Sequence, residues 1–198
     1  MAVHRIIEAN AARYGDAPAI SDHRVTLTYR ELNQRANAVA RRLIAEGFRR
    51  SGLAIVNLPR CADTAVVLLG VLKAGGRYVF VDPQSEDTDW PEGISFAGLS
   101  DTRETCYRNV DITSILGPCV RSSANLPIIA RETDVACVIP DGNGTTEILV
   151  PHGTIMSLQG CAAPRTTEWF GKAGALDLWA GLLNGATVLL RDALHSAA

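Results

Sequence analysis

The chain has 198 residues, of which 47% are hydrophobic and 20% charged, and its formal net charge is −2. This composition is typical of a globular protein with a core, and the absence of a basic excess argues against a nucleic-acid partner. No apolar run reaches the roughly 18 residues that cross a bilayer, and the N-terminus lacks the apolar segment of a signal peptide, so we expect a cytoplasmic protein.

The cysteines predict neither a disulfide framework nor a metal site. Their number is odd, their spacing is wide, and no CxxC pair accompanies them. We interpret them as buried, inert thiols, with a catalytic cysteine assisted by one of the histidines as the alternative. The five are Cys61, Cys106, Cys119, Cys137 and Cys161.

The N-terminal third predicts two helices separated by a short hairpin. Apolar residues at helical spacing predict the first helix from Val3 to Arg13. Apolar pairs within 19–27 flank a polar turn and predict the hairpin. Thr28 and Glu31 match a capping box, in which each side chain accepts a hydrogen bond from the other residue's backbone N–H. A long helix should therefore start there and end near Gly47, where a positive φ is easy.

The next segment predicts a strand, a helix and a second strand. Residues 53–58 are almost continuously apolar, as in a strand covered on both faces. A helix should start near Ala62 and end at Gly75 and Gly76, and residues 78–81 form the following strand. A right-handed parallel crossover of this kind belongs to layered folds. We therefore predict an α/β fold with parallel or mixed sheets flanked by helices.

The apolar pattern weakens in the middle of the chain. Residues 84–133 are polar and contain several prolines, so we predict an irregular connecting region there. It would separate a first α/β lobe at 1–83 from the truncated start of a second lobe at 134–198. In the second lobe we expect strands at 135–139, 148–150 and 188–190, and helices at about 154–161 and 176–183.

The segment from Pro140 to His152 has the glycines and hydroxyls of a phosphate-binding loop without its positive charge. Such loops hold phosphate through backbone N–H groups and usually add a Lys or Arg. Here the charged positions are Asp141 and Glu147, and a carboxylate about 4 Å from a phosphate oxygen costs roughly 4 kcal/mol at an effective dielectric near 20. These charges argue against ATP and Mg²⁺ binding, and we predict no cofactor and no metal. A plain turn is the alternative interpretation of the degenerate loop positions, which are Asp141, Gly142, Asn143, Gly144, Thr145 and Thr146.

Four separated stretches identify a family resemblance. They are residues 12–19, residues 27–33, residues 69–79 with the following Asp82 and Pro83, and residues 182–190. In this order they resemble the early core motifs of the adenylation domains of nonribosomal peptide synthetases, within the adenylate-forming, AMP-binding ligase superfamily. The resemblance implies the first part of the N-terminal core of such an enzyme, which activates an amino acid with ATP.

Two functional positions depart from the pattern of that family. The loop before Val150, Pro151 and His152 is shorter than the family's and lacks its Lys. Where the family has an Asp that holds the substrate's α-amino group, an ungapped alignment places Lys172, and a cation cannot pair with an ammonium. The resemblance also implies later motifs, among them a ribose-binding Asp and a C-terminal catalytic Lys, for which the chain has no counterpart.

These departures lead to the functional hypothesis. We expect a truncated, catalytically inactive adenylation-domain-like protein that acts as a helper, scaffold or regulator in nonribosomal peptide biosynthesis through protein contacts. Truncation should expose apolar surface around 148–150 and 176–190, so a homodimer or a peptide-synthetase-type partner should cover the region 135–192. The alternatives are one piece of a split amino-acid-adenylating enzyme, a small-ligand binder at the altered loop, or an evolutionary remnant.

Overall fold

The computed structural model describes residues 1–81, 93–99, 105–110, 116, 124–127, 130–140, 147–160, 166–168 and 175–190. The helices of this part are α1 (Val3–Arg13), α2 (Tyr29–Ala45), α3 (Ala62–Lys73), α5 (His152–Met156) and α6 (Leu176–Leu183). The strands are β1 (Pro18–Ser21), β2 (Thr26–Thr28), β3 (Leu53–Asn57), β4 (Arg77–Val81), β5 (Gly93–Leu99), β6 (Thr105–Val110), β7 (Val135–Pro140), β8 (Glu147–Pro151), β9 (Thr166–Glu168) and β10 (Thr187–Leu189).

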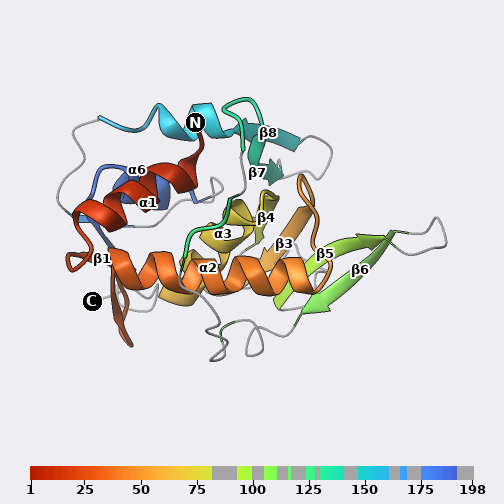
Figure 1. Cartoon of the computed structure of the whole chain (residues 1–198), viewed down its shortest axis with the longest axis horizontal. Helices are drawn as coiled ribbons and strands as arrows, with labels where there is room; N and C mark the ends of the chain where they lie inside the picture. The colour runs from red at the N-terminus through yellow and green to blue at the C-terminus, as the bar shows by residue number, and fades with distance from the viewer. Residues whose placement is uncertain are drawn as a thin grey trace, which may run out of the picture.

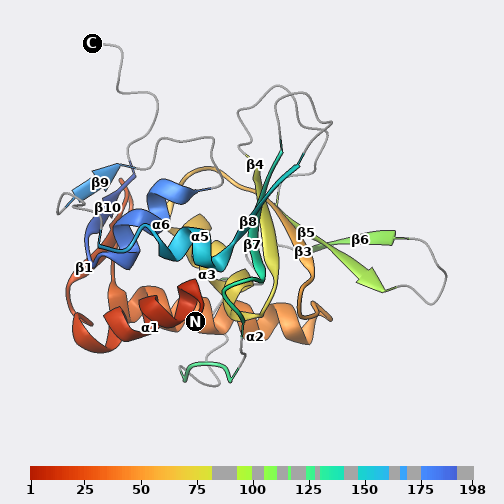
Figure 2. The same ribbon diagram turned by 90° about the horizontal axis from the view of Figure 1, so that it is seen from above.

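The strands form two mixed sheets with helices between them. One sheet has the order β2-β1-β10-β9 and the other the order β6-β5-β3-β4-β7-β8. Seen from above, the two sheets lie at opposite ends of a layer that contains α3, α5 and α6, while α1 and α2 run along one side (Figure 1, Figure 2). The α/β architecture with helix-flanked mixed sheets, which the sequence predicted, is confirmed.

The N-terminal elements follow the local signals of the sequence. The first helix spans Val3–Arg13 as predicted, and β1 and β2 form the predicted antiparallel hairpin. The capping box is complete, because Glu31 N donates to Thr28 Oγ1 at 3.2 Å and Thr28 N donates to Glu31 Oε2 at 2.9 Å. At the other end of α2, Gly47 has a φ of +93°. Both ends of this helix are therefore set by nearby residues.

The predicted parallel crossover is also confirmed, and its helix is the most deeply buried element. Strands β3 and β4 pair in parallel from Leu53↔Arg77 to Asn57↔Val81. Every residue of α3 except Asp63 is buried. A helix that is apolar nearly all round must be covered on all sides. Here β3 and β4 cover one side, and α1 and α2 cover the others.

Both sheets join strands that are distant in the sequence. Strand β4 pairs in parallel with β7, and β1 pairs in parallel with β10. Strands from residues 1–83 and from residues 134–198 thus share each sheet, while the division into two lobes stays a prediction. The structure adds β5 and β6, an antiparallel pair, within the region expected to be irregular. Helix α5 begins and ends earlier than the predicted helix at 154–161.

Of the two segments that were expected to expose apolar side chains, one does so and the other does not. Ile148 and Leu149 on β8 are 56% and 52% exposed, as expected. The expectation for 176–190 is wrong, because α1 packs against α6 and the Tyr29 hydroxyl lies 2.8 Å from the carbonyl oxygen of Ala186. The buried side chains of this segment include Leu178, Trp179, Leu182, Leu183, Val188 and Leu190.

Replacing Gly70 with alanine tests the close packing of α2 on α3. A Cβ atom at Gly70 would lie 2.5 Å from Val39 Cγ1 and 2.7 Å from Val39 Cβ, and Val39 is a stiff β-branched residue. Gly70→Ala should therefore lower the free energy of unfolding by about 1–3 kcal/mol, although alanine favours helix. Urea unfolding measures this change. Val39→Ala removes the side chain that the new Cβ would meet, so in the double variant the two losses should be less than additive. A stabilised Gly70→Ala variant would contradict the contact.

Candidate functional site

The two residues that flank the degenerate phosphate loop, Pro140 and Glu147, lie at the carboxyl edge of the six-stranded sheet. Strands β7 and β8 are antiparallel, and Pro140 is the register partner of Glu147, so the loop connects the ends of two paired strands. Because β7 runs parallel to β4, this end of the hairpin is at the carboxyl end of the parallel strands. Ligands of open α/β sheets bind at that edge. The strand ends that flank the loop therefore lie at an edge that suits a binding site.

The charge at the described end of this loop is negative. Glu147 is exposed at the start of β8 and precedes the exposed Ile148 and Leu149. The six loop positions from Asp141 to Thr146 and the predicted amine-anchor position Lys172 lie outside the described residues. Their placement and contacts therefore remain predictions.

Cys61 and Cys137 are cysteines of the described part of the chain, and neither belongs to a metal site there. Cys137 is buried on β7, and burial raises the pKa of its thiol to about 11. Cys61 is partly exposed just before α3, with its Sγ atom 3.3 Å from Thr64 Oγ1. Among the described residues, no group of three or more His, Cys, Asp and Glu side chains could hold a metal ion.

None of the helices in the described ranges is long and apolar enough to cross a membrane.

A buried charge cluster joins α1 to the central helix. Lys73 Nζ on α3 donates to Glu8 Oε1 on α1 at 2.5 Å, and both side chains are almost fully buried. Arg5 donates to the other oxygen of Glu8 at 2.7 Å. Burial alone would raise the pKa of Glu8, but the hydrogen bonds and charges of Lys73 and Arg5 outweigh it and hold the pKa below its usual value. Glu8 is therefore an ionised carboxylate between two cations.

Two buried histidines lie beside this cluster. His152, at the start of α5, accepts a hydrogen bond at its Nδ1 atom from the Val3 backbone N–H at 3.3 Å. Its ring centroid is 6.1 Å from that of His4, in an edge-on arrangement. Burial lowers the pKa of His4 to about 4 against the opposing charge of Glu8, and lowers that of His152 to about 4 against the opposing charge of Asp134. Both imidazoles are therefore neutral near pH 7.

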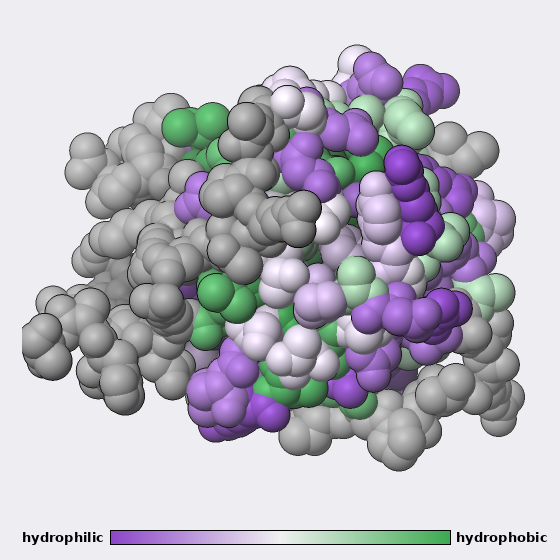
Figure 3. Space-filling model, turned by 90° about the vertical axis from the view of Figure 1, so that its left-hand side faces the viewer, coloured by the Kyte–Doolittle hydropathy of each residue, from purple (hydrophilic) through white to green (hydrophobic). Residues whose placement is uncertain are grey.

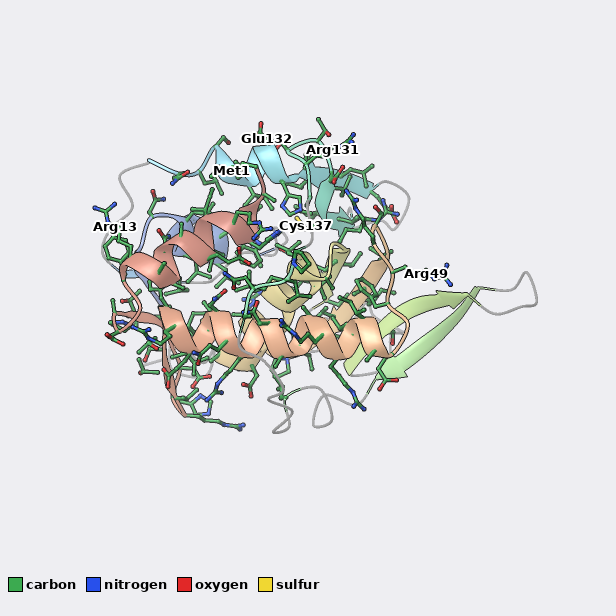
Figure 4. The ribbon with its side chains drawn as sticks, viewed as in Figure 1. Met1, Arg13, Arg49, Arg131, Glu132 and Cys137 are labelled. Atoms are coloured by element: carbon green, nitrogen blue, oxygen red, sulfur yellow. The ribbon has the colours of Figure 1, made fainter. Side chains whose placement is uncertain are left out.

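The backbone around His152 attaches the β7–β8 hairpin to the same region. His152 N donates to the Asp134 carbonyl at 2.9 Å, and Gly153 N donates to the Glu132 carbonyl at 2.9 Å. The Met1 ammonium lies 3.2 Å from Glu132 Oε1, next to Arg131 at the top of the view in Figure 4. The start of α1 and the base of the hairpin thus form one contact region.

Sequence reasoning did not find this cluster. His4 and Glu8 are distant in the sequence from Lys73 and His152, and no local pattern relates the two pairs. The available signal is Lys73 itself, a lone cation at the end of an otherwise apolar helix. A buried ammonium requires a carboxylate partner. That argument predicts a partner without identifying Glu8.

Comparison with known proteins places the fold in a family. Residues 7–97 match the model of a family described as AMP-binding enzyme. The chain is 31% identical to tyrocidine synthase 3 of Brevibacillus parabrevis over 217 residues, which cover 95% of the chain and 3% of that protein. It is 27% identical to bacitracin synthase 1 of Bacillus licheniformis over 211 residues, which cover 95% of the chain and 4% of that protein. The chain resembles the AMP-binding enzyme family over residues 7–97 and peptide synthetases over 95% of its length.

A solved structure identifies the part of the family fold that is present. The N-terminal subdomain of Klebsiella oxytoca NpsA, in complex with 3-hydroxyanthranilyl-AMSN, superposes with a TM-score of 0.76 at 17% identity. The match covers 96% of this chain and 53% of that subdomain. The chain therefore resembles the N-terminal part of the adenylation domain of nonribosomal peptide synthetases, as the sequence motifs indicated, and spans a small share of the curated relatives.

Breaking the buried ion pair should be far more costly than breaking one on the surface. Lys73→Met leaves Glu8 buried with Arg5 as its remaining partner, so we expect the free energy of unfolding to fall by about 3–5 kcal/mol. Arg42→Ala removes the half-exposed pair with Glu46 and should cost at most about 1 kcal/mol. Urea unfolding at pH 7 measures both. Equal effects of the two substitutions would contradict a special role of the buried pair.

Proposed function

We propose that this protein is an adenylation-domain-like protein without ATP-dependent amino-acid activation, which assists nonribosomal peptide biosynthesis as a helper, scaffold or regulator through protein contacts. The family and the fold support the link to peptide synthetases. The charges of the loop sequence and of Lys172 support the loss of activity.

The loop charge is the observation that carries the proposal. From Pro140 to Val150 the sequence contains two carboxylates and no Lys, Arg or His. Glu147 stands at the mouth of the loop as the register partner of Pro140. Each carboxylate near a phosphate oxygen would cost roughly 4 kcal/mol at an effective dielectric near 20, which is about a thousandfold in affinity. Lys172 would further disfavour the ammonium of an amino-acid substrate.

Reversing the loop charge tests the proposal directly. The protein as it stands should show no saturable ATP binding and no ATP-dependent pyrophosphate exchange with a panel of amino acids. Asp141→Ser combined with Glu147→Lys removes both carboxylates and supplies a cation, so calorimetry should detect ATP binding at least about tenfold above the upper limit for the unaltered protein.

A matched control separates a local effect from a general one. Asp16→Lys makes the protein more positive by two charges, against three for the double loop variant, at a side chain that is 92% exposed in the turn between α1 and β1. It should leave ATP affinity unchanged. Pyrophosphate exchange by the unaltered protein on its own would overturn the proposed loss of activity. Exchange that appears only after a second polypeptide is added would favour a split enzyme instead.

The proposed partner surface centres on β8, within the region 135–192. Strand β8 is an edge strand, and Ile148 and Leu149 point to opposite faces of the sheet, yet both are more than half exposed. An edge with exposed apolar residues favours pairing with another chain. On the face that carries the end of α1 and the β1–β2 hairpin, by contrast, hydrophilic side chains are interspersed with hydrophobic ones (Figure 3). We propose that a second copy or a peptide-synthetase-type protein covers β8.

Removing the two apolar side chains should weaken this association. Ile148→Ser with Leu149→Ser removes apolar area on both faces of β8, so the dissociation constant should rise by roughly 10- to 100-fold. Sedimentation velocity over a concentration series measures the homodimer, and co-sedimentation with a purified peptide-synthetase module measures the other partner. Ile44→Ser, at a residue 41% exposed on α2, is the control and should have no effect. A monomer that binds neither partner would contradict the proposed surface.

A further inference from the structure

The start of α1 receives its capping hydrogen bond from a different element. Val3 is the first residue of α1, and its N–H is one of the donors that a helix cannot satisfy internally. The N-cap residue Ala2 provides no side-chain acceptor. His152 Nδ1, on α5, accepts from Val3 N at 3.3 Å instead. The imidazole of His152 therefore acts as the cap of α1.

This cap works only while His152 is neutral. A neutral imidazole has one acceptor nitrogen, whereas the protonated ring has two donors and no acceptor. Protonation would thus remove the acceptor for the Val3 N–H. It would also put a positive charge at the N-terminus of α1, which is the positive end of the helix dipole.

His4 adds a second proton-sensitive group to the same junction. It is 2% exposed, its ring centroid is 6.1 Å from that of His152, and its Nδ1 atom has no hydrogen-bond partner among the described residues. A proton on either ring would repel a proton on the other. Within the part of the chain that the structure describes, Glu8 and Asp134 offer the negative charge to offset this, and Glu8 is already shared by two cations. The charged groups that act on the two rings or on Lys73 beside them are Arg5, Glu8, Arg41, Lys73, Asp134 and the Met1 ammonium.

We propose that His152 and His4 form an acid-sensitive latch, which holds the first turn of α1 against α5 and the base of the β7–β8 hairpin when neutral and releases it when protonated. Release uncovers the apolar residues of the first turns of α1, which include Val3, Ile6 and Ile7. It also frees the base of the hairpin whose edge carries Ile148 and Leu149. Release of the latch thus changes both the start of α1 and the base of the β7–β8 hairpin. This inference does not depend on whether the protein binds nucleotide.

The size and direction of the effect follow from linkage. Burial lowers the pKa of each histidine from 6.5 to about 4, so the released state binds more protons than the latched state between these values. The latch is fully stable above about pH 6.5 and weakens as the pH falls toward 4. From pH 7 to pH 5, the equilibrium for release should shift by about 20-fold for one histidine, and by several hundredfold for two that titrate independently.

Hydrogen exchange measures this release directly. The amides of Val3 to Ile7 should lose protection between pH 7 and pH 5 by about 20-fold or more, after correction for the pH dependence of intrinsic exchange. The amides of α3 serve as the internal reference for global unfolding and should lose less. Unchanged protection at the start of α1 would overturn the proposal.

The choice of variant makes the test specific for the imidazole. His152→Asn keeps an acceptor near the position of Nδ1 but cannot be protonated, so its share of the pH dependence should disappear. His23→Asn, at the exposed turn between β1 and β2, is the matched control and should behave like the unaltered protein. An unchanged pH dependence in His152→Asn would contradict the latch.

Direct titration keeps the proposal testable if His152→Asn does not fold. Ring proton shifts of His152 in the unaltered protein should show a midpoint well below 6.5, with loss of the α1 contacts along the same curve. A midpoint near the ordinary value, or titration without release of α1, would overturn the latch.

Discussion

The burial of α3 on all sides is the constraint from which most of the structure follows. A helix whose residues are all buried except the partly exposed Asp63, and whose side chains are mostly apolar, can persist only inside a complete shell. The crossover strands provide one wall, α2 approaches closely through Gly70, and α1 closes the remaining side. Lys73 is the single buried cation of this helix, so the element that packs over it must carry a carboxylate. Glu8 meets that requirement and fixes how α1 lies.

Local signals in the sequence predicted most elements but not how the sheets are assembled. The capping box at Thr28 and Glu31, the apolar run at 53–58 and the glycines after α3 act over a few residues, and the structure has the predicted helices and strands there. The pairing of β1 with β10 depends on contacts across almost the whole chain, for which no local pattern exists. Strands β5 and β6 were not predicted, because the segment that contains them is rich in polar residues.

For the candidate site, too, local features could be predicted from the sequence and the packing between distant segments could not. The position of the altered loop between two strands could be read from the sequence, since the apolar runs on either side are clear, and β7 and β8 are paired as neighbours. Which apolar residues are exposed to solvent could not be predicted equally well from the sequence. Residues 176–190 have the composition of an interface, yet Asn10 and Tyr29 from the N-terminal region reach their carbonyl groups and α1 covers them. Composition indicates that a segment needs covering, and only the packing indicates what covers it.

The parallel pairing of β1 with β10 has a consequence for how the protein folds. Ile20 is the register partner of Val188, so the sheet that contains the N-terminal hairpin cannot be completed until almost all of the described chain is available. Contacts between such distant residues close late and slow folding, because the chain entropy of a long loop is lost before the contact forms. During synthesis, β1 and β2 would wait as a two-stranded hairpin, which is marginal in water by itself. The α2–α3 pair with β3 and β4 relies on nearer contacts and is the natural nucleus on which the two ends of the chain later meet.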